Sequence, residues 1–505
     1  MLATLVLAVI VQSPPVASTP TDPGLERGVV LVEKGDAAAA VAELDGAVRR
    51  LSAERRFNEL ARAHLYLGAA YVLLGQDQAA RASFKEALHW SEFDRFAHGR
   101  VPPKVIEFFA QVLKDTGRAG GPPPEIPLGV TMLELPWTGC CLEVFLPPGT
   151  RQVVVDAKGA GDFRSLAAAI RSEPSARILV RPGIYRESLR LDRPVALIGE
   201  GPREAIVIES EGAPALAMST SFALVEGVTI RARPAGSASP FAVEVAQGQL
   251  VLRGCDLSSE ALSVVTAHDA GTAVLENCLV HDTRDAGVFA FAGGRATVQG
   301  GVVRGCRLGA DVRGGTLEMS QTRVERSTGI GILLEAGSRA TLDAVDVSGS
   351  GDVNLAVSGA EATVRGGRIH DGRRGVTVAE GARLSLEGVD IVGHSSTGLG
   401  LGMGGRVTMK RGSVVKSEET GILLDQAELL LEDGLVEDNR MSGLVVRQGG
   451  TATARRTAFH KNRGYGVLVH GGGNMTVEAS TLSGNRAGSF HAERGGLLTR
   501  IGNKD

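Results

Sequence analysis

Residues 443–488 read GLVVRQGGTATARRTAFHKNRGYGVLVHGGGNMTVEASTLSGNRAG and contain two copies of one unit. Each copy starts with a small residue and alternating aliphatics, continues with a second alternating run, and reaches an Asn near its end. Alternation with a period of two is typical of β-strands with one buried face. Gly supplies the positive-φ corners that other residues resist. The stretch therefore predicts short strands joined by tight turns.

The same unit recurs upstream in steps of 21 to 23 residues. Two or three short strands per unit of about 22 residues make one coil of a solenoid, in which stacking of neighbours buries the core. The units start at Gly287, Gly309, Gly331, Asn354, Gly375, Gly398, Gly421, Gly443 and Gly466.

Four residues before each unit lies a polar or small turn position. Its occupants are Thr283, Gly305, Ser327, Ser350, Asp371, His394, Ser417, Asn439, Asn462 and, continuing the series, Asn485. The last three predict an Asn ladder, with side-chain amides bonding between coils.

Residues 153–201 read VVVDAKGAGDFRSLAAAIRSEPSARILVRPGIYRESLRLDRPVALIGEG. They predict a strand, a helix that starts near Phe163 with Asp162 as its cap, and then short strands. Such a helix can cover the open end of a solenoid, which would otherwise expose apolar core and unpaired strand edges. Tyr185, within PGIYRE, is expected to pack in this cap.

The segment resembles the N-terminal cap of the pectin lyase-like, right-handed parallel β-helix superfamily, and is especially similar to the start of pectinesterases. The repeats are similar to the domain shared by carbohydrate-binding proteins and sugar hydrolases, and to a periplasmic accessory family for copper-enzyme maturation. The resemblance covers residues 150–505 and implies a right-handed parallel β-helix. Its motifs are turn chemistry, so it implies the fold more than the activity.

Residues 25–118 carry apolar patterning with a period of 3.6 and predict an all-α domain. The segment resembles tetratricopeptide repeats, which implies helical hairpins whose concave face contacts a protein partner; the alternative is an N-terminal packing domain. The residues at the repeat spacings are Leu67, Gly68, Tyr71, Gly75, Ala80, Phe84 and Ala87.

The chain as a whole is predicted to be an exported multidomain protein. Its ten-residue apolar run at 2–11 is too short to span a bilayer, and Val16-Ala17-Ser18 offers a cleavage site. We expect localisation to the periplasm, the cell envelope or the exterior, with no transmembrane segment. A net charge of −3 implies no attraction to nucleic acid. The expected parts are a signal peptide at 1–18, the tetratricopeptide-like domain at 25–118, a Pro/Gly-rich linker at 119–150, a β-helix cap with the first strands at 151–200, and the β-helix at 201–505.

The five cysteines are an odd number and do not predict a disulfide framework. Cys255 and Cys278, 23 residues apart, are expected to stack on adjacent coils, and a disulfide there or at Cys140/Cys141 stays open. Without a C-x-x-C pair, no zinc site is expected. We predict no metal and no cofactor.

The sequence offers few catalytic candidates. The Asp-containing motifs of pectinesterases and polygalacturonases are absent, so their roles do not transfer. Sugar grooves stack pyranose faces on Trp and Tyr, yet residues 151–505 contain no Trp and two Tyr. The remaining candidates are Glu318 with Asp343, the one adjacent acidic pair in an outward charge ladder, and His370 with Asp371 at a strand-to-turn corner. The ladder comprises Glu276, Gln299, Glu318, Asp343, Arg365, Glu387, Lys410, Glu432, Arg455 and Glu478.

The leading hypothesis is an exported, non-catalytic scaffold or binding protein that presents a β-helix surface, with helices for protein contacts. The alternative is an envelope polysaccharide lyase, glycoside hydrolase or epimerase. A second alternative is a periplasmic maturation or binding factor. A carboxylate–arginine cluster in a groove would favour the enzyme, whereas a flat surface of alternating charges would favour the scaffold.

Overall fold

The structure of the chain, a computed structural model, describes residues 22–53, 57–90, 104–105, 108–109, 111–112, 151–173, 177–236, 241–493 and 495–505. The chain divides into two compact units, residues 1–147 and 148–505. The predicted signal peptide and linker lie outside the described residues, as do Cys140 and Cys141.

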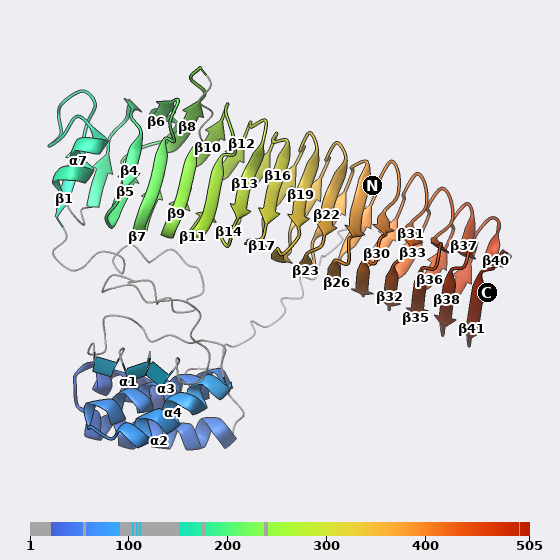
Figure 1. Ribbon diagram of the computed structural model, residues 1–505, viewed down its shortest axis with the longest axis horizontal. Helices are drawn as coiled ribbons and strands as arrows, with labels where there is room; N and C mark the ends of the chain where they lie inside the picture. Colours follow the sequence, from blue (N-terminus) through green and yellow to red (C-terminus); the bar gives the residue numbers. More distant parts are fainter. Residues whose placement is uncertain are drawn as a thin grey trace, which may run out of the picture. The chain divides into compact units, whose positions relative to one another are not determined.

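The first unit contains the helices that the apolar periodicity predicted (Figure 1). Its long helices are α1 (Pro23–Glu33), α2 (Ala37–Ala53), α3 (Phe57–Leu73) and α4 (Asp77–Trp90), each packed against the next. A Cβ on Gly68 would lie 2.4 Å from the Phe84 ring, so this glycine allows α3 and α4 to approach closely. Helix packing alone does not establish tetratricopeptide-like repeats, and that assignment stays a prediction. Within the described part, no helix is long and apolar enough to cross a membrane.

The second unit is a right-handed parallel β-solenoid of about 15 turns, with strands of successive coils side by side (Figure 1). Each coil contributes strands to three faces, and every neighbouring pair is parallel. The long strands β7, β9 and β11 run through the first and second faces and join them into one sheet.

The first face comprises β4 (Leu189–Leu191), the first parts of β7 (Leu216–Glu226), β9 (Val243–Arg253) and β11 (Val265–Glu276), then β13 (Ala286–Phe291), β16 (Leu308–Arg313), β19 (Ile330–Glu335), β22 (Val353–Ser358), β25 (Arg374–Ala379), β28 (Leu399–Leu401), β31 (Ile422–Asp425), β34 (Leu444–Arg447), β37 (Tyr465–Val469) and β40 (Gly488–Ala492). The second face comprises β1 (Gln152–Val155), β2 (Arg177–Val180), β5 (Val195–Gly199), the second parts of β7, β9 and β11, then β14 (Arg295–Gln299), β17 (Thr316–Ser320), β20 (Arg339–Asp343), β23 (Glu361–Arg365), β26 (Arg383–Glu387), β29 (Arg406–Lys410), β32 (Glu428–Glu432), β35 (Thr451–Arg455), β38 (Asn474–Glu478) and β41 (Leu497–Ile501).

The third face comprises β3 (Gly183–Arg186), β6 (Ile206–Glu211), β8 (Thr229–Arg233), β10 (Asp256–Ser259), β12 (Leu279–His281), β15 (Val302–Arg304), β18 (Arg323–Glu325), β21 (Asp346–Ser348), β24 (Arg368–His370), β27 (Asp390–Val392), β30 (Ser413–Val415), β33 (Leu435–Glu437), β36 (Ala458–His460) and β39 (Thr481–Ser483). One short 3-10 helix, η1 (Arg203–Ala205), precedes β6.

A short helix, α7 (Leu166–Ser172), belongs to the predicted cap, but its capping residue differs from the expectation. Ser165, not Asp162, is the N-cap, and Asp162 instead accepts a bond from the Val154 amide at 2.8 Å. Glu187 of the PGIYRE stretch accepts bonds from the Ser165 hydroxyl and the first two helical amides at 2.8–3.0 Å. Tyr185 is buried and donates to the Arg181 carbonyl at 2.8 Å, as a packing role requires. The motif thus ties the cap helix to the first coils.

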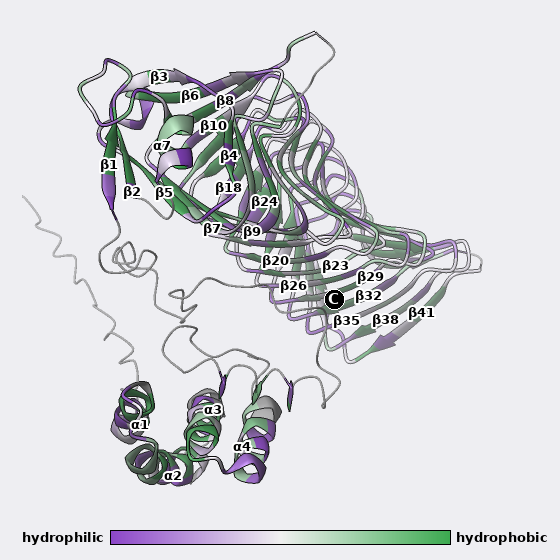
Figure 2. Ribbon diagram, turned by 60° about the vertical axis from the view of Figure 1, so that its left-hand side comes forward, coloured by the Kyte–Doolittle hydropathy of each residue, from purple (hydrophilic) through white to green (hydrophobic). Residues whose placement is uncertain are grey.

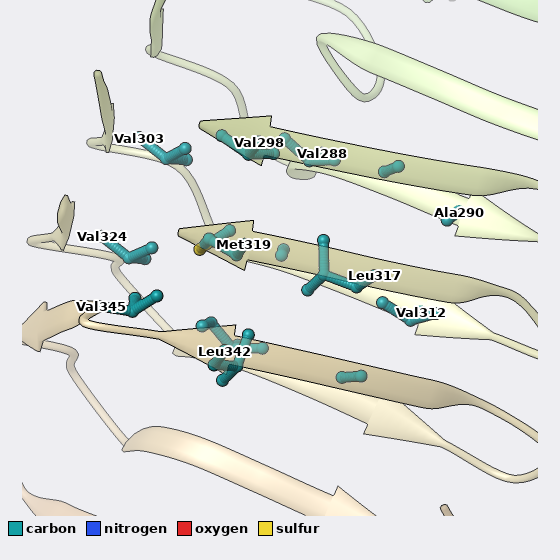
Figure 3. Close-up of a cluster of buried hydrophobic side chains, with 14 of the residues drawn as sticks. Val288, Ala290, Val298, Val303, Val312, Leu317, Met319, Val324, Leu342 and Val345 are labelled. Carbon is teal, nitrogen blue, oxygen red and sulfur yellow. The ribbon is translucent and has the colours of Figure 1, made fainter. Parts of the chain in front are cut away.

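The core of the solenoid consists of the inward residues of all three faces. Hydrophobic and hydrophilic residues alternate along the strands (Figure 2). Val298 and Val303 of one coil lie in the interior next to Met319 and Val324 of the following coil (Figure 3). The cysteines of the described residues, Cys255, Cys278 and Cys306, are buried free thiols in this interior.

A ladder of side chains fills the corner between the third and first faces. The Asn439 amide nitrogen donates to Asn462 Oδ1 at 2.9 Å, and Asn462 donates in the same way to Asn485 at 2.9 Å. Each Oδ1 also accepts the backbone N–H of the preceding rung, as between Asn439 N and Asn462 Oδ1 at 3.1 Å. The predicted Asn ladder is therefore confirmed; Asn439 and Asn462 are fully buried, and Asn485 is partly buried.

Two residues that the sequence pattern assigned to the ladder are instead the residues that directly precede the ladder position. Gly305 and Asp371 have positive φ values of 62° and 51° and make the turn itself, whereas Cys306 and Gly372 occupy the ladder position. Spacing alone does not separate these two adjacent turn positions, because the coils differ in length by a residue or two.

The small residue at the start of each unit is explained by the same corner. A Cβ on Gly421 would lie 2.7 Å from both the Asn439 amide nitrogen and the Gly443 carbonyl oxygen. The ladder therefore excludes a side chain at this position.

In one coil, the polar ladder residue and the small residue at the unit start exchange places. Asn354 stands where the other units have Gly, and Gly372 stands at the ladder position of the next corner. Asn354 Oδ1 accepts the Ser350 N–H at 3.1 Å, and its amide nitrogen donates to the His370 carbonyl at 2.8 Å and to His394 Nε2 at 3.2 Å. A Cβ on Gly372 would lie 2.8 Å from Asn354 Oδ1. The side-chain amide of Asn354, which lies on the first face, thus replaces the amide that Gly372 does not supply at the ladder position.

This exchange predicts a double-mutant cycle. Gly372→Asn alone forces a second amide into the space of Asn354, and Asn354→Gly alone leaves the buried Ser350 N–H without its acceptor. Each single variant should lose about 1–3 kcal/mol of unfolding free energy. The double variant should recover most of that loss, because it rebuilds the pattern of neighbouring coils. Urea unfolding of all four proteins measures the coupling; strictly additive losses would contradict the exchange.

His394 predicts a pH dependence. The residue is fully buried, and desolvation lowers its pKa from 6.5 to about 4. The unfolded chain takes up this proton first, so stability falls as the pH drops from about 6.5 towards 4, by about 3 kcal/mol. His394→Asn places the Asn439 side-chain type at the same corner and should remove this component. The measurement is the difference in unfolding free energy between the two proteins at pH 7 and pH 4.5; a constant difference would contradict the prediction.

Candidate functional site

The outward charge ladder on the second face is present, with one correction. The registers stack Asp343, Arg365, Glu387, Lys410, Glu432, Arg455 and Glu478 on successive coils. Glu432 contacts Lys410 at 3.1 Å and Arg455 at 3.7 Å. The rung before Asp343 is Ser320, whereas Glu318 pairs with Thr341 one column away. The expected adjacency of Glu318 and Asp343 is therefore wrong by two residues.

His370 and Asp371 do come together on the third face. His370 Nδ1 lies 2.6 Å from Asp371 Oδ2, and His370 Nε2 lies 3.1 Å from Asp346 Oδ1. His281 is held in the same way between Asp256 and Asp282, four strands earlier on this face. The hydrogen bond with Asp256 raises the pKa of His281.

In both places the histidine contacts the Asp that follows it and an Asp of the preceding coil. We therefore interpret the arrangement as a structural link between adjacent coils. Beyond His370, the third face carries an open groove of 690 Å³, lined by residues that include Arg368, Asp390, Val415, Lys416, Leu435 and Lys461.

A different set of side chains meets on the outer side of the first face. We call this set the platform; its members are Glu244, His268, Asp269, Phe289, Phe291, Asp311, Arg313 and Glu335. They come from β9, β11, β13, β16 and β19, with Asp269 at a bulge within β11. The registers align Glu244, Phe289 and Asp311 in one outward column, and His268, Phe291, Arg313 and Glu335 in the next.

Aromatic rings form the centre of the platform. The rings of Phe289 and Phe291 are 4.8 Å apart and nearly parallel, and the His268 ring stacks on Phe291 at 5.1 Å. Both phenylalanines are half-buried. They point outward because Ala290 between them points into the core. The sequence argument counted only Trp and Tyr, so it did not consider these two phenylalanines.

Charged groups lie at both ends of the rings. His268 Nδ1 is 2.8 Å from Asp269 Oδ2, and its Nε2 is 3.3 Å from Glu244 Oε1. At the other end Arg313 lies over the Phe289 ring at 5.5 Å and contacts Asp311 at 2.7 Å and Glu335 at 3.0 Å.

The second end contains a buried carboxylate that is paired with an arginine. Asp311 is 2% exposed, although its strand position faces outward. The hydrogen bond with Asp311 raises the pKa of Arg313, which stays charged. A carboxylate–arginine cluster is therefore present, but it lies on the outer side of the first face and not in the groove described above, so the condition stated for an enzyme is met only in part.

The platform could be found in the sequence only partly. The tripeptide Phe289-Ala290-Phe291 places two aromatic residues at outward positions of one strand, which is a usable signal. The other members are separated from it by 20 residues or more, and only the stacking of coils brings them together. Among the described residues, no group of three or more His, Cys, Asp and Glu side chains could hold a metal ion.

Comparison with known proteins agrees with the fold. The sequence profile described as "Right handed beta helix region" matches residues 309–440 and 420–504. No curated protein matches the chain.

Two solved structures illustrate the likeness. The chain is similar to the catalytic unit of a thermostable GH87 alpha-1,3-glucanase from Streptomyces thermodiastaticus, with 16% identity over 71% of this chain and 69% of that one and a TM-score of 0.35. It is also similar to the A-module of a mannuronan C-5 epimerase from Azotobacter vinelandii, with 15% identity over 67% and 90% of the two chains and a TM-score of 0.36. Likeness at this level concerns the β-helix architecture, not the chemistry.

The ion pair of the platform predicts an unequal response to one substitution. Arg313→Met would leave the buried Asp311 carboxylate without its cation, at a cost of about 3–5 kcal/mol. Arg447→Met is the matched control, because Arg447 pairs with the more exposed Asp425 on the same face; its loss should be about 0–1 kcal/mol. Urea unfolding at pH 7 measures both. Equal losses would show that Asp311 does not depend on Arg313.

Proposed function

We propose that this chain is a polysaccharide-modifying enzyme of the β-helix type and that the platform is its glycan site. The observation that carries the proposal is the Asp311–Arg313–Glu335 cluster beside the paired rings of Phe289 and Phe291. Aromatic rings can stack on the apolar faces of sugar rings, and carboxylates accept hydrogen bonds from sugar hydroxyls.

His268 is the residue we assign to proton transfer. Its ring stacks on Phe291, so it borders the surface on which the sugar would lie. The carboxylates of Glu244 and Asp269 hold its two nitrogens and orient the ring. A carboxylate-oriented imidazole is a common general acid or base in enzymes.

A non-catalytic glycan-binding scaffold is the second candidate. The observation that favours it is that both nitrogens of His268 already face carboxylates, so a catalytic step requires one of these bonds to open. The charge-alternating second face also fits a structural surface. In both readings we propose that the chain is exported and that the helical unit contacts a protein partner.

The test is a panel of polysaccharides assayed for binding and for new reducing ends or unsaturated products. Phe289→Ala should abolish binding to the preferred glycan, whereas Leu468→Ala, an outward apolar residue in the same column of the first face, should leave it unchanged. His268→Gln should keep binding and lose about 10²–10⁴-fold in product formation.

Two outcomes separate the candidates. Platform-dependent binding without any product would overturn the enzyme and support the scaffold. Equal binding by Phe289→Ala and the unaltered chain would overturn the platform as the glycan site.

A further inference from the structure

The geometry points to a glycan with free amino groups, so that the platform takes a cationic amino-sugar polymer and not a polyuronate. This inference rests on the proposed function and names the substrate class of the same site.

Charge is the first argument. The platform combines four carboxylates with one guanidinium and one imidazole. Asp269, Glu335 and Glu244 are the accessible acids, with side chains 69%, 43% and 31% exposed. The guanidinium that could neutralise a uronate, Arg313, is already paired with Asp311 and Glu335. An ammonium group is attracted to such a surface and a sugar carboxylate is repelled.

A buried hydroxyl is the second and independent argument. Thr266 lies in the outward column between Glu244 and Phe289 and is 0% exposed. Its Oγ1 has no hydrogen-bond partner. A buried hydroxyl without a partner calls for an explanation, and this one lies on the outward side of the strand, within the platform. A sugar amino or hydroxyl group bound between Glu244 and Phe289 is the partner that we assign to it.

The rings give the third argument. Arg313 already lies over the face of Phe289 at 5.5 Å, so the platform accepts a cation on an aromatic face. The acids at both ends of the ring pair then lie within reach of neighbouring sugars along a polymer.

The experiment compares three soluble glycans of matched length: a glucosamine polymer, its N-acetylated counterpart and polygalacturonate. Binding is measured by calorimetry with the full chain at pH 6, at low and at high salt. We expect the glucosamine polymer to bind most tightly and to weaken as salt rises, because screening reduces charge attraction. The double variant Asp269→Asn/Glu335→Gln should weaken this binding about tenfold and remove most of its salt dependence, and it should weaken binding of the acetylated glycan less.

The control is Glu361→Gln/Asp390→Asn, which removes two exposed acids from the second and third faces. If it weakens binding as much as the platform variant, the attraction is general and the inference is overturned. Equal or tighter binding of polygalacturonate, abolished by Phe289→Ala, would overturn the inference and leave the proposed function standing. If Phe289→Ala changes binding of none of the three glycans, both fail.

Discussion

The structure depends on hydrogen bonding between successive coils, above all at the corner where the strands of the third face turn into those of the first. Parallel strands satisfy each other along the faces, but a turn exposes backbone groups that no strand partner reaches. The ladder of Asn439, Asn462 and Asn485 supplies those partners. An amide group left without a hydrogen-bond partner in this interior would be destabilising. The ladder residues of successive coils must therefore stay aligned along the whole stack.

That constraint explains the composition of the repeats. The unit starts are small because the ladder amides and the next coil's carbonyls occupy the space of a side chain. The exchange of Asn354 and Gly372 shows that the requirement concerns the amide and not the strand that carries it. His394 fits the same corner at the cost of a buried imidazole, which is why its pKa is low.

The outward side chains of the three faces are not bound by this constraint. Their composition can therefore differ from face to face, and this difference points to the candidate site. On the second face, opposite charges stack and offset each other from Asp343 to Glu478. On the first face the outward columns instead gather two phenylalanines, a histidine and four acids within five neighbouring strands. This departure from charge alternation is the reason why we place the proposed glycan site on the first face.

The amino-acid sequence by itself determined the period-two strands, the 21- to 23-residue coil, the Asn ladder and the cap, because each is a local pattern with a local physical cause. It misplaced Glu318 by two residues and Gly305 and Asp371 by one, since coil length varies and a turn residue shifts every later outward position. It also assigned the helix cap to Asp162, whereas Ser165 and Glu187 make it.

Only the tertiary structure decided the platform, because Glu244, His268, Phe289, Arg313 and Glu335 meet through the stacking of coils, and no local pattern specifies which outward residues of different coils become neighbours.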